Sequence, residues 1–139
     1  MQQSVRDWMK DLVVFIEPDA KVTDALAQMR HRYVNSLNVR KTDTNPEYGI
    51  VTSIDICDKI VAREANPSNV RVVEIMNSPL ITVHQDLSLK ECARMMKENR
   101  IHHLPVCDDS GNIVGMISAA DFLIVAEVLG RGAGDRVLS

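Results

Sequence analysis

The sequence predicts an α/β protein made of two pseudo-symmetric repeats, each with the order strand, helix, strand, strand, helix. Two observations lead to this fold class. Matching residues recur at a nearly constant offset along the 139-residue chain, and in both copies the hydrophobic spacing alternates between that of strands and that of helices. We therefore expect a first repeat at 1–68, a second at 69–130 and a flexible C-terminal tail at 131–139.

The two copies align at an offset of 67 residues, at which Val5–Met9 resembles Val72–Met76. The most similar segments, Gly49–Asp55 and Gly115–Asp121, lie 66 residues apart, so one residue has been lost in the loop before the second. A single slip confined to a loop makes chance similarity improbable. The other matched pairs are Asp19 and Asp86, Val22 and Leu89, Met29 and Met96, Leu37 and Leu104, and Val39 and Val106.

Each copy opens with a short apolar strand, expected at 13–16 and 81–83, and continues with an amphipathic helix. In the second copy Ser88 and Glu91 have the spacing of a capping box, in which both side chains bind free backbone N–H groups. In the first copy Lys21 takes the cap position, so we expect that helix start to fray. The remaining strands are expected at 37–39, 50–51, 104–106 and 113–117, and a helix closes each copy.

The composition excludes several classes of protein. The net charge is −3 and only 4% of residues are aromatic, so the chain has neither a basic footprint for nucleic acid nor a platform for stacking bases. No apolar run approaches the roughly 20 residues that cross a membrane. The three cysteines form no Cys-x-x-Cys pair, which fits reduced thiols in the cytoplasm and indicates no metal site. No arrangement of residues indicates catalysis, so we do not expect an enzyme.

The closing helices are apolar on more than one side. Phe122–Ala126, followed by Val128 and Leu129, leaves almost no polar residue except Glu127. A helix with this pattern is buried on more than one side. Packing between the copies can cover one side and a second protomer the other, so we expect a homodimer.

A motif that carries chemistry occurs once in each copy, where a strand is expected to pass into a helix. Gly49 and Gly115 begin the motif, and a glycine there can let a ligand approach the backbone closely. The hydroxyls of Thr52 and Ser118 stand at the helix start. Free N–H groups and the positive end of the helix dipole favour an anion such as phosphate at that point.

An acid follows each hydroxyl residue after one helical turn. Asp55 and Asp121 present carboxylates, which only accept hydrogen bonds and therefore suit the two hydroxyls of a ribose. The alternative is purely structural: Thr52 and Ser118 would be helix caps, and the acids would complement the helix dipole. The duplication of both the hydroxyl and the acid favours a nucleoside-phosphate pocket.

The paired copies resemble a tandem of cystathionine-β-synthase-type (CBS) domains, the arrangement called a Bateman module. The segments that carry the resemblance are Gly49–Asp55, Gly115–Asp121 and Arg100–Val106, and it extends over about residues 5–130. It implies two lobes packed through their sheets with two clefts between them. It also implies binding of AMP, ADP or ATP, sometimes of S-adenosylmethionine or a dinucleotide, with no cofactor required.

The resemblance also implies roles for individual residues. Asp55 and Asp121 would hold the ribose. Thr52 and Ser118 would lie beside the phosphate. The residues that would line the base pocket are Ile50, Met116, Ile81 and Thr82.

Basic residues just before the Leu-Pro pair would contact phosphate by the same resemblance. In the second copy these positions are His102 and His103, whereas the first copy has Asn35 and Ser36. We therefore expect the cleft with the histidines to take the more highly charged phosphate chain. Because phosphate favours protonated histidine, binding should strengthen as the pH falls toward 6.

The function that the sequence predicts is a stand-alone regulatory sensor. An adenosine nucleotide would favour one conformation, which the dimer would present to a separate effector protein. Two alternatives remain. The chain could be a ligand-free structural dimerisation module with vestigial clefts, or a small enzyme acting on nucleotides.

Overall fold

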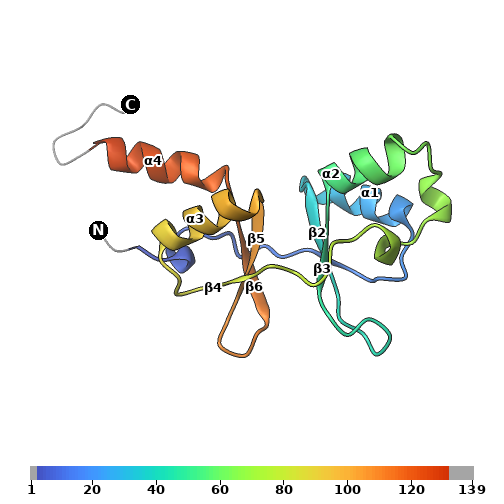
Figure 1. Cartoon of the computed structure of the whole chain (residues 1–139), viewed down its shortest axis with the longest axis horizontal. Helices are drawn as coiled ribbons and strands as arrows, with labels where there is room; N and C mark the ends of the chain where they lie inside the picture. The colour runs from blue at the N-terminus through green and yellow to red at the C-terminus, as the bar shows by residue number, and fades with distance from the viewer. Residues whose placement is uncertain (1–2, 132–139) are drawn as a thin grey trace. The chain divides into compact units, whose positions relative to one another are not determined.

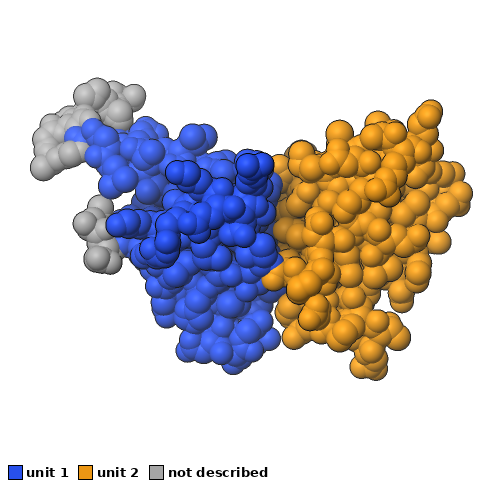
Figure 2. Space-filling view, in the orientation of Figure 1, with its two compact units in different colours: residues 1–12, 81–139 blue, residues 13–80 orange. Residues whose placement is uncertain are grey.

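The computed structural model describes residues 3–131 and divides the chain into two compact units (Figures 1 and 2). Unit 1 comprises residues 1–12 and 81–139, and unit 2 comprises residues 13–80. The units differ from the sequence repeats at their edges. Unit 1 includes residues 1–12 of the first repeat, and unit 2 includes residues 69–80 of the second. The predicted tail at 131–139 lies outside the described residues, apart from Arg131.

Unit 2 contains a three-stranded sheet in the order β1-β2-β3, with β1 parallel and β3 antiparallel to β2. Two short 3-10 turns lie in its C-terminal part, and Val72 of the second turn belongs to its core. Its elements are β1 (Phe15–Ile16), α1 (Val22–Arg32), β2 (Ser36–Val39), β3 (Gly49–Thr52), α2 (Ser53–Ile56), the π-helical turn η2 (Cys57–Val61), η3 (Pro67–Asn69) and η4 (Val72–Glu74).

Unit 1 repeats this arrangement with the sheet order β4-β5-β6, again parallel and then antiparallel. The predicted order of strand, helix, strand, strand, helix is therefore confirmed in both units, and with it the α/β class. The elements of unit 1 are η1 (Val5–Asp7), β4 (Val83–His84), α3 (Leu89–Asn99), β5 (His103–Cys107), β6 (Ile113–Ser118) and α4 (Asp121–Arg131).

Each unit has its own hydrophobic core between its sheet and its helices, which lie on one face of the sheet (Figure 1). In unit 2, Leu37 and Val51 of the sheet pack with Val22 of α1. In unit 1, Leu104 and Ile117 take the corresponding places. All five side chains are fully buried. This packing fixes the end of β3 and of β6, where the predicted motifs pass into helices.

A segment that precedes each repeat's first strand crosses the third strand of a unit. In unit 1, Lys10 pairs with Met116 of β6 through N–H···O bonds of 2.8 Å in both directions. In unit 2, Asn77 pairs in the same way with Ile50 of β3, at 2.9 and 3.0 Å. We call residues 4–10 and 71–77 the crossing segments. They place Lys10 and Asn77 at matching positions in the two units.

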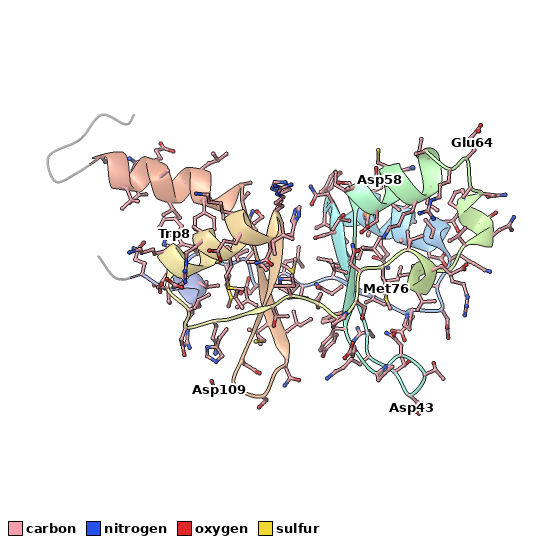
Figure 3. All side chains as sticks on the ribbon, in the orientation of Figure 1. Trp8, Asp43, Asp58, Glu64, Met76 and Asp109 are labelled. Carbon is pink, nitrogen blue, oxygen red and sulfur yellow. The ribbon has the colours of Figure 1, made fainter. Side chains whose placement is uncertain are left out.

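The crossing segments explain both motif glycines. A Cβ added to Gly49 would lie 2.6 Å from the sulfur of Met76, and one added to Gly115 would lie 2.6 Å from the sulfur of Met9. Figure 3 shows Met76 beside β3. The structure therefore gives the glycines a packing role: they make room for the chain's own methionines. Their predicted contact with a ligand stays a prediction.

The helix starts agree with the sequence only in part. The hydroxyl of Ser88 accepts the N–H of Glu91 at 3.2 Å, as a capping serine should. The carboxylate of Glu91, however, pairs with Arg94 instead of returning to the backbone of Ser88. The start of α1 has no side-chain acceptor at Lys21, and Asp24 accepts the N–H of Lys21 at 3.3 Å.

Apolar side chains are exposed on the closing helices of both units. On α4, Leu123, Ile124 and Leu129 are more than half exposed, and so are Ile54 and Val61 in unit 2. None of the helices formed by residues 3–131 combines the length and apolar character that a membrane span requires.

Candidate functional site

Both predicted acids lie at the start of a closing helix and are almost fully buried. Asp55 Oδ2 accepts the N–H of Thr52 at 2.9 Å and its hydroxyl at 3.2 Å. Asp121 Oδ2 accepts the same two groups of Ser118, at 2.8 and 3.2 Å. One oxygen of each acid is therefore used in capping its own helix.

The second oxygen of Asp55 is also occupied. Its Oδ1 lies 3.1 Å from Lys59 Nζ and accepts the side-chain amide of Asn77 at 3.0 Å, and that amide also reaches Oδ2 at 3.1 Å. Lys59 in turn donates to the carbonyl oxygen of Ile75 at 2.8 Å. A carboxylate has about four acceptor sites. The five contacts of Asp55 therefore leave no acceptor open.

The second oxygen of Asp121 has a different environment. Its Oδ1 contacts Lys10 Nζ at 3.2 Å, and no further hydrogen bond or ion pair to this carboxylate occurs within residues 3–131. The side chain of Lys10 is 72% exposed, whereas that of Lys59 is 25% exposed. Asp121 therefore keeps one oxygen whose partner is a surface lysine that solvent can replace.

His103 joins the Asp121 group through the strand pairing of β5 and β6, in which it lies opposite Ser118. Burial lowers the pKa of His103, as does the neighbouring His102, and the negative charge of Asp121 opposes both effects. The imidazole of His103 is therefore mainly neutral at pH 7. His102 is exposed, and its carbonyl accepts the N–H of Ala119 at 2.9 Å.

The corresponding residues of unit 2 carry no charge. Ser36 lies opposite Thr52, and the carbonyl of Asn35 accepts the N–H of Ser53 at 3.0 Å. The backbone of the two sites is therefore the same, while the histidines occur only in unit 1, as the sequence predicts.

The residues expected to line a base pocket are placed less uniformly. Ile50 lies on β3 and Met116 on β6, the strands that precede the two acids. The backbone of each residue pairs with a crossing segment. Ile81 is 44% exposed, and Thr82 Oγ1 lies 3.9 Å from Cys107 Sγ. Among residues 3–131, neither Ile81 nor Thr82 forms a hydrogen bond with Ser118 or Asp121.

A hollow of about 340 Å³ lies elsewhere in unit 1, beside α3 and α4. It contains none of the residues predicted from the sequence to bind ligand. Its lining consists of Gln3, Ser88, Leu89, Lys90, Ala93, Phe122, Val125 and Leu129.

Three residues that contact the acids were not predicted from the sequence: Lys10, Asn77 and Lys59. Lys10 and Asn77 follow the repeated Met9 and Met76 at the same offset, so the alignment contained the signal for their equivalence. Lys59 stands four residues after Asp55, the spacing of an ion pair on one helix face. Neither signal indicates by itself that Lys59 and Asn77 contact Asp55, or that Lys10 contacts Asp121.

Comparison with known proteins agrees with the duplicated fold. The CBS domain family matches the chain twice, over residues 5–62 and 72–127. The chain belongs to the CBS domain family. The two matches show a tandem CBS module, and modules of this kind are regulatory and bind nucleotides.

Among curated relatives, the protein MK0525 of Methanopyrus kandleri is 30% identical over 117 residues. The match covers 84% of this chain and 59% of MK0525, so the chain spans little more than half of that relative. A hexameric CBS-CP12 protein from bloom-forming cyanobacteria is 31% identical with a TM-score of 0.86, covering 99% of this chain and 74% of that one.

A further solved structure is the CBS domain pair of the protein MJ0100 in complex with 5-methylthioadenosine and S-adenosyl-L-methionine. It is 23% identical with a TM-score of 0.75, and the match covers 94% of this chain and 98% of that one. At this identity the likeness concerns the fold.

Proposed function

We propose that the chain is a regulatory module that binds an adenosine nucleotide, such as AMP, ADP or ATP, through the Asp121 group of unit 1. The observation that carries the proposal is the state of Asp121: a buried carboxylate with one oxygen held in a helix cap and the other contacted by an exposed lysine. A ribose diol supplies hydroxyl donors that can replace the lysine at Oδ1.

The groups around Asp121 suit the phosphate of the same ligand. Ser118 ends β6 just before α4, an 11-residue helix whose dipole favours an anion at its N-terminus. Lys10, once displaced from Asp121, remains close enough to offer its charge to a phosphate. A bound phosphate would favour the protonated form of the neighbouring His103, so ATP binding should strengthen as the pH falls toward 6.

The proposed mechanism is a shift between conformations without chemistry on the ligand. Binding favours one state of the module by no more than the ligand's preference for that state. The exposed apolar residues Leu123, Ile124 and Leu129 of α4 support self-association as a homodimer, which would present the change to a separate effector protein. The three free cysteines fit a reducing compartment such as the cytoplasm.

The test is thermal unfolding with and without nucleotide. A ligand at 100 times its Kd adds about 2.7 kcal/mol to the free energy of unfolding. We expect AMP or ATP to raise the Tm of the wild-type chain. The same nucleotide should not change the Tm of Asp121→Ala. Asp109→Ala is the matched control, because Asp109 is an exposed acid of the same unit at the β5–β6 turn (Figure 3).

A second candidate is a ligand-free dimerisation module. The capping role of Asp55 and Asp121 favours it, because these acids have a structural use without any ligand. A Tm that no adenosine compound raises, in a protein that sediments as a dimer, would support this candidate and contradict the first. Consumption of the added nucleotide would indicate an enzyme instead.

A further inference from the structure

The internal duplication supplies a matched comparison of two acid sites in one chain. Asn77 of unit 2 corresponds to Lys10 of unit 1, since both follow a repeated methionine and pair with the third strand. Lys59, four residues after Asp55, corresponds to Val125, four residues after Asp121. The acids, the caps and the crossing backbone are the same, and these two positions differ.

Lys59 is held in place from two directions. Its Nζ contacts Asp55 Oδ1 at 3.1 Å and donates to the carbonyl of Ile75 at 2.8 Å, so it joins the closing helix to the crossing segment. A ligand that displaced it would leave that ammonium group partly buried without its carboxylate, which is costly. In unit 1 the corresponding side chain, Val125, is apolar and buried and makes no such contact.

Asn77 completes the occupation of Asp55. Its amide lies 3.0 and 3.1 Å from the two oxygens, so it covers the edge on which a sugar diol would donate. Its backbone is fixed by two hydrogen bonds to Ile50, which hold the amide in position. Lys10, its counterpart, makes one contact to Asp121 from a largely exposed side chain.

We infer that Lys59 and Asn77 are internal occupants of the Asp55 site and restrict nucleotide binding to the Asp121 site. This inference rests on the proposed function and specifies it: each chain takes one nucleotide, and the acid of unit 2 serves stability. Lys59 and Asn77 are then the residues that determine how many ligands the duplicated module binds.

The first experiment is calorimetric titration of the full chain with AMP and with ATP. We expect one equivalent per chain for the nucleotide that binds, and a loss of about 100-fold or more in affinity for Asp121→Asn, which removes hydrogen bonds to a charged acceptor. Two equivalents, of which Asp121→Asn loses one, would overturn the inference while leaving the proposed function intact. One equivalent that persists in Asp121→Asn would overturn both. Absence of binding by any adenosine compound would overturn both.

The second experiment exchanges the matched residues. The double variant Lys59→Val, Asn77→Lys gives Asp55 the neighbours that Asp121 has in the wild type. We expect this variant to bind a second equivalent, and the additional substitution Asp55→Asn to remove that second equivalent. A folded double variant that still binds one equivalent would contradict the role of Lys59 and Asn77.

A surface substitution keeps the inference testable if the double variant does not fold. Lys10→Asn places the amide of the unit 2 site opposite Asp121, and Lys10→Ala removes the lysine without adding a donor. We expect Lys10→Asn to bind AMP about tenfold more weakly than Lys10→Ala, the effect of one hydrogen bond to a carboxylate. Equal affinities for the two variants would show that an amide at this position does not block the acid.

Discussion

The two units share a fold and a motif, yet their acids are in different states. Within residues 3–131, Asp55 is surrounded by donors from its own helix and from the crossing segment, whereas Asp121 has one oxygen contacted only by an exposed lysine. The difference arises outside the motif, at one position on the following turn of helix and one on a segment far away in the sequence. A duplicated motif can therefore place its acid in two different environments.

The largest effect on stability is expected from removing the two acids in turn. Asp55→Ala leaves Lys59 and Asn77 without their acceptor, so we expect a loss of about 3 kcal/mol, the lower end for breaking a buried ion pair. Asp121→Ala removes a helix-cap acceptor and one exposed contact, so about 1 kcal/mol is expected. Urea unfolding of both variants measures the difference, and equal losses would contradict the contrast between the sites.

Substitutions of the two motif glycines, which adjoin the crossing segments, should have the next largest effect on stability. A Cβ at Gly115 would lie 2.9 Å from the carbonyl oxygen of Lys10, and one at Gly49 would lie 3.1 Å from that of Asn77. The methionine sulfurs can move, but the carbonyls belong to paired backbone. We expect Gly115→Ala to cost about 2 kcal/mol and Gly49→Ala about 1 kcal/mol, within the range for overpacking.

Gly130 supplies the control for these glycine variants. It lies in α4, and a Cβ there would meet nothing within 4 Å. We expect Gly130→Ala to raise the free energy of unfolding by up to about 1 kcal/mol, because alanine favours a helix more than glycine does. Thermal unfolding of the three variants checks the order, and a tolerated alanine at position 115 would contradict it.

Two substitutions at helix caps should have smaller effects on stability, one a loss and the other a gain. Ser88→Ala removes the acceptor for the N–H of Glu91 and should cost about 1 kcal/mol. Lys21→Ser supplies the hydroxyl that the start of α1 lacks and should add about 0.5 kcal/mol or more. Hydrogen exchange at the first turns of α1 and α3 would show whether each change acts locally, and a Lys21→Ser variant without gain would contradict the assignment.

The smallest effect is a pH dependence confined to unit 1. The pKa of His103 in the folded chain lies below the ordinary value of 6.5 because of burial and the neighbouring His102. As the pH falls below 6.5, the unfolded chain takes up the proton first, so the folded state loses stability until its own imidazole protonates. Well above 6.5 the imidazole is neutral in both states and contributes no slope.

Unfolding measured from pH 7.5 to 5 in the wild type and in His103→Asn separates this contribution. The variant should show a flatter dependence over that range, while His102→Asn retains part of the slope because burial still lowers the pKa of His103. A steeper dependence in His103→Asn would reverse the assigned direction.

Much of the fold could be predicted from the sequence because it depends on local periodicity and on duplication. The repeat offset, the order of elements and the acids at the helix starts follow from apolar spacing and from Gly49–Asp55 and Gly115–Asp121. The first strands are shorter than expected: Phe15–Ile16 replaces 13–16, and Val83–His84 replaces 81–83. Strand length depends on the partner strand, which the sequence does not display.

What the sequence could not provide is contact between distant segments. The resemblance of Val5–Met9 to Val72–Met76 was visible, but not that each segment packs on the unit of the other repeat. For the same reason the sequence does not show that each motif glycine adjoins a methionine. The occupation of Asp55 by Asn77, 22 residues away, likewise needs the folded chain.

The crossing segments also bear on how such a chain could have arisen. Residues 1–12 complete the unit of the second repeat, and residues 69–80 complete that of the first. A single ancestral copy with the same arrangement would cover its third strand by exchanging this arm with another molecule, as swapped dimers do. Reciprocal arm exchange between identical chains would then have come before gene fusion, and the present molecule would retain that partnership within one polypeptide.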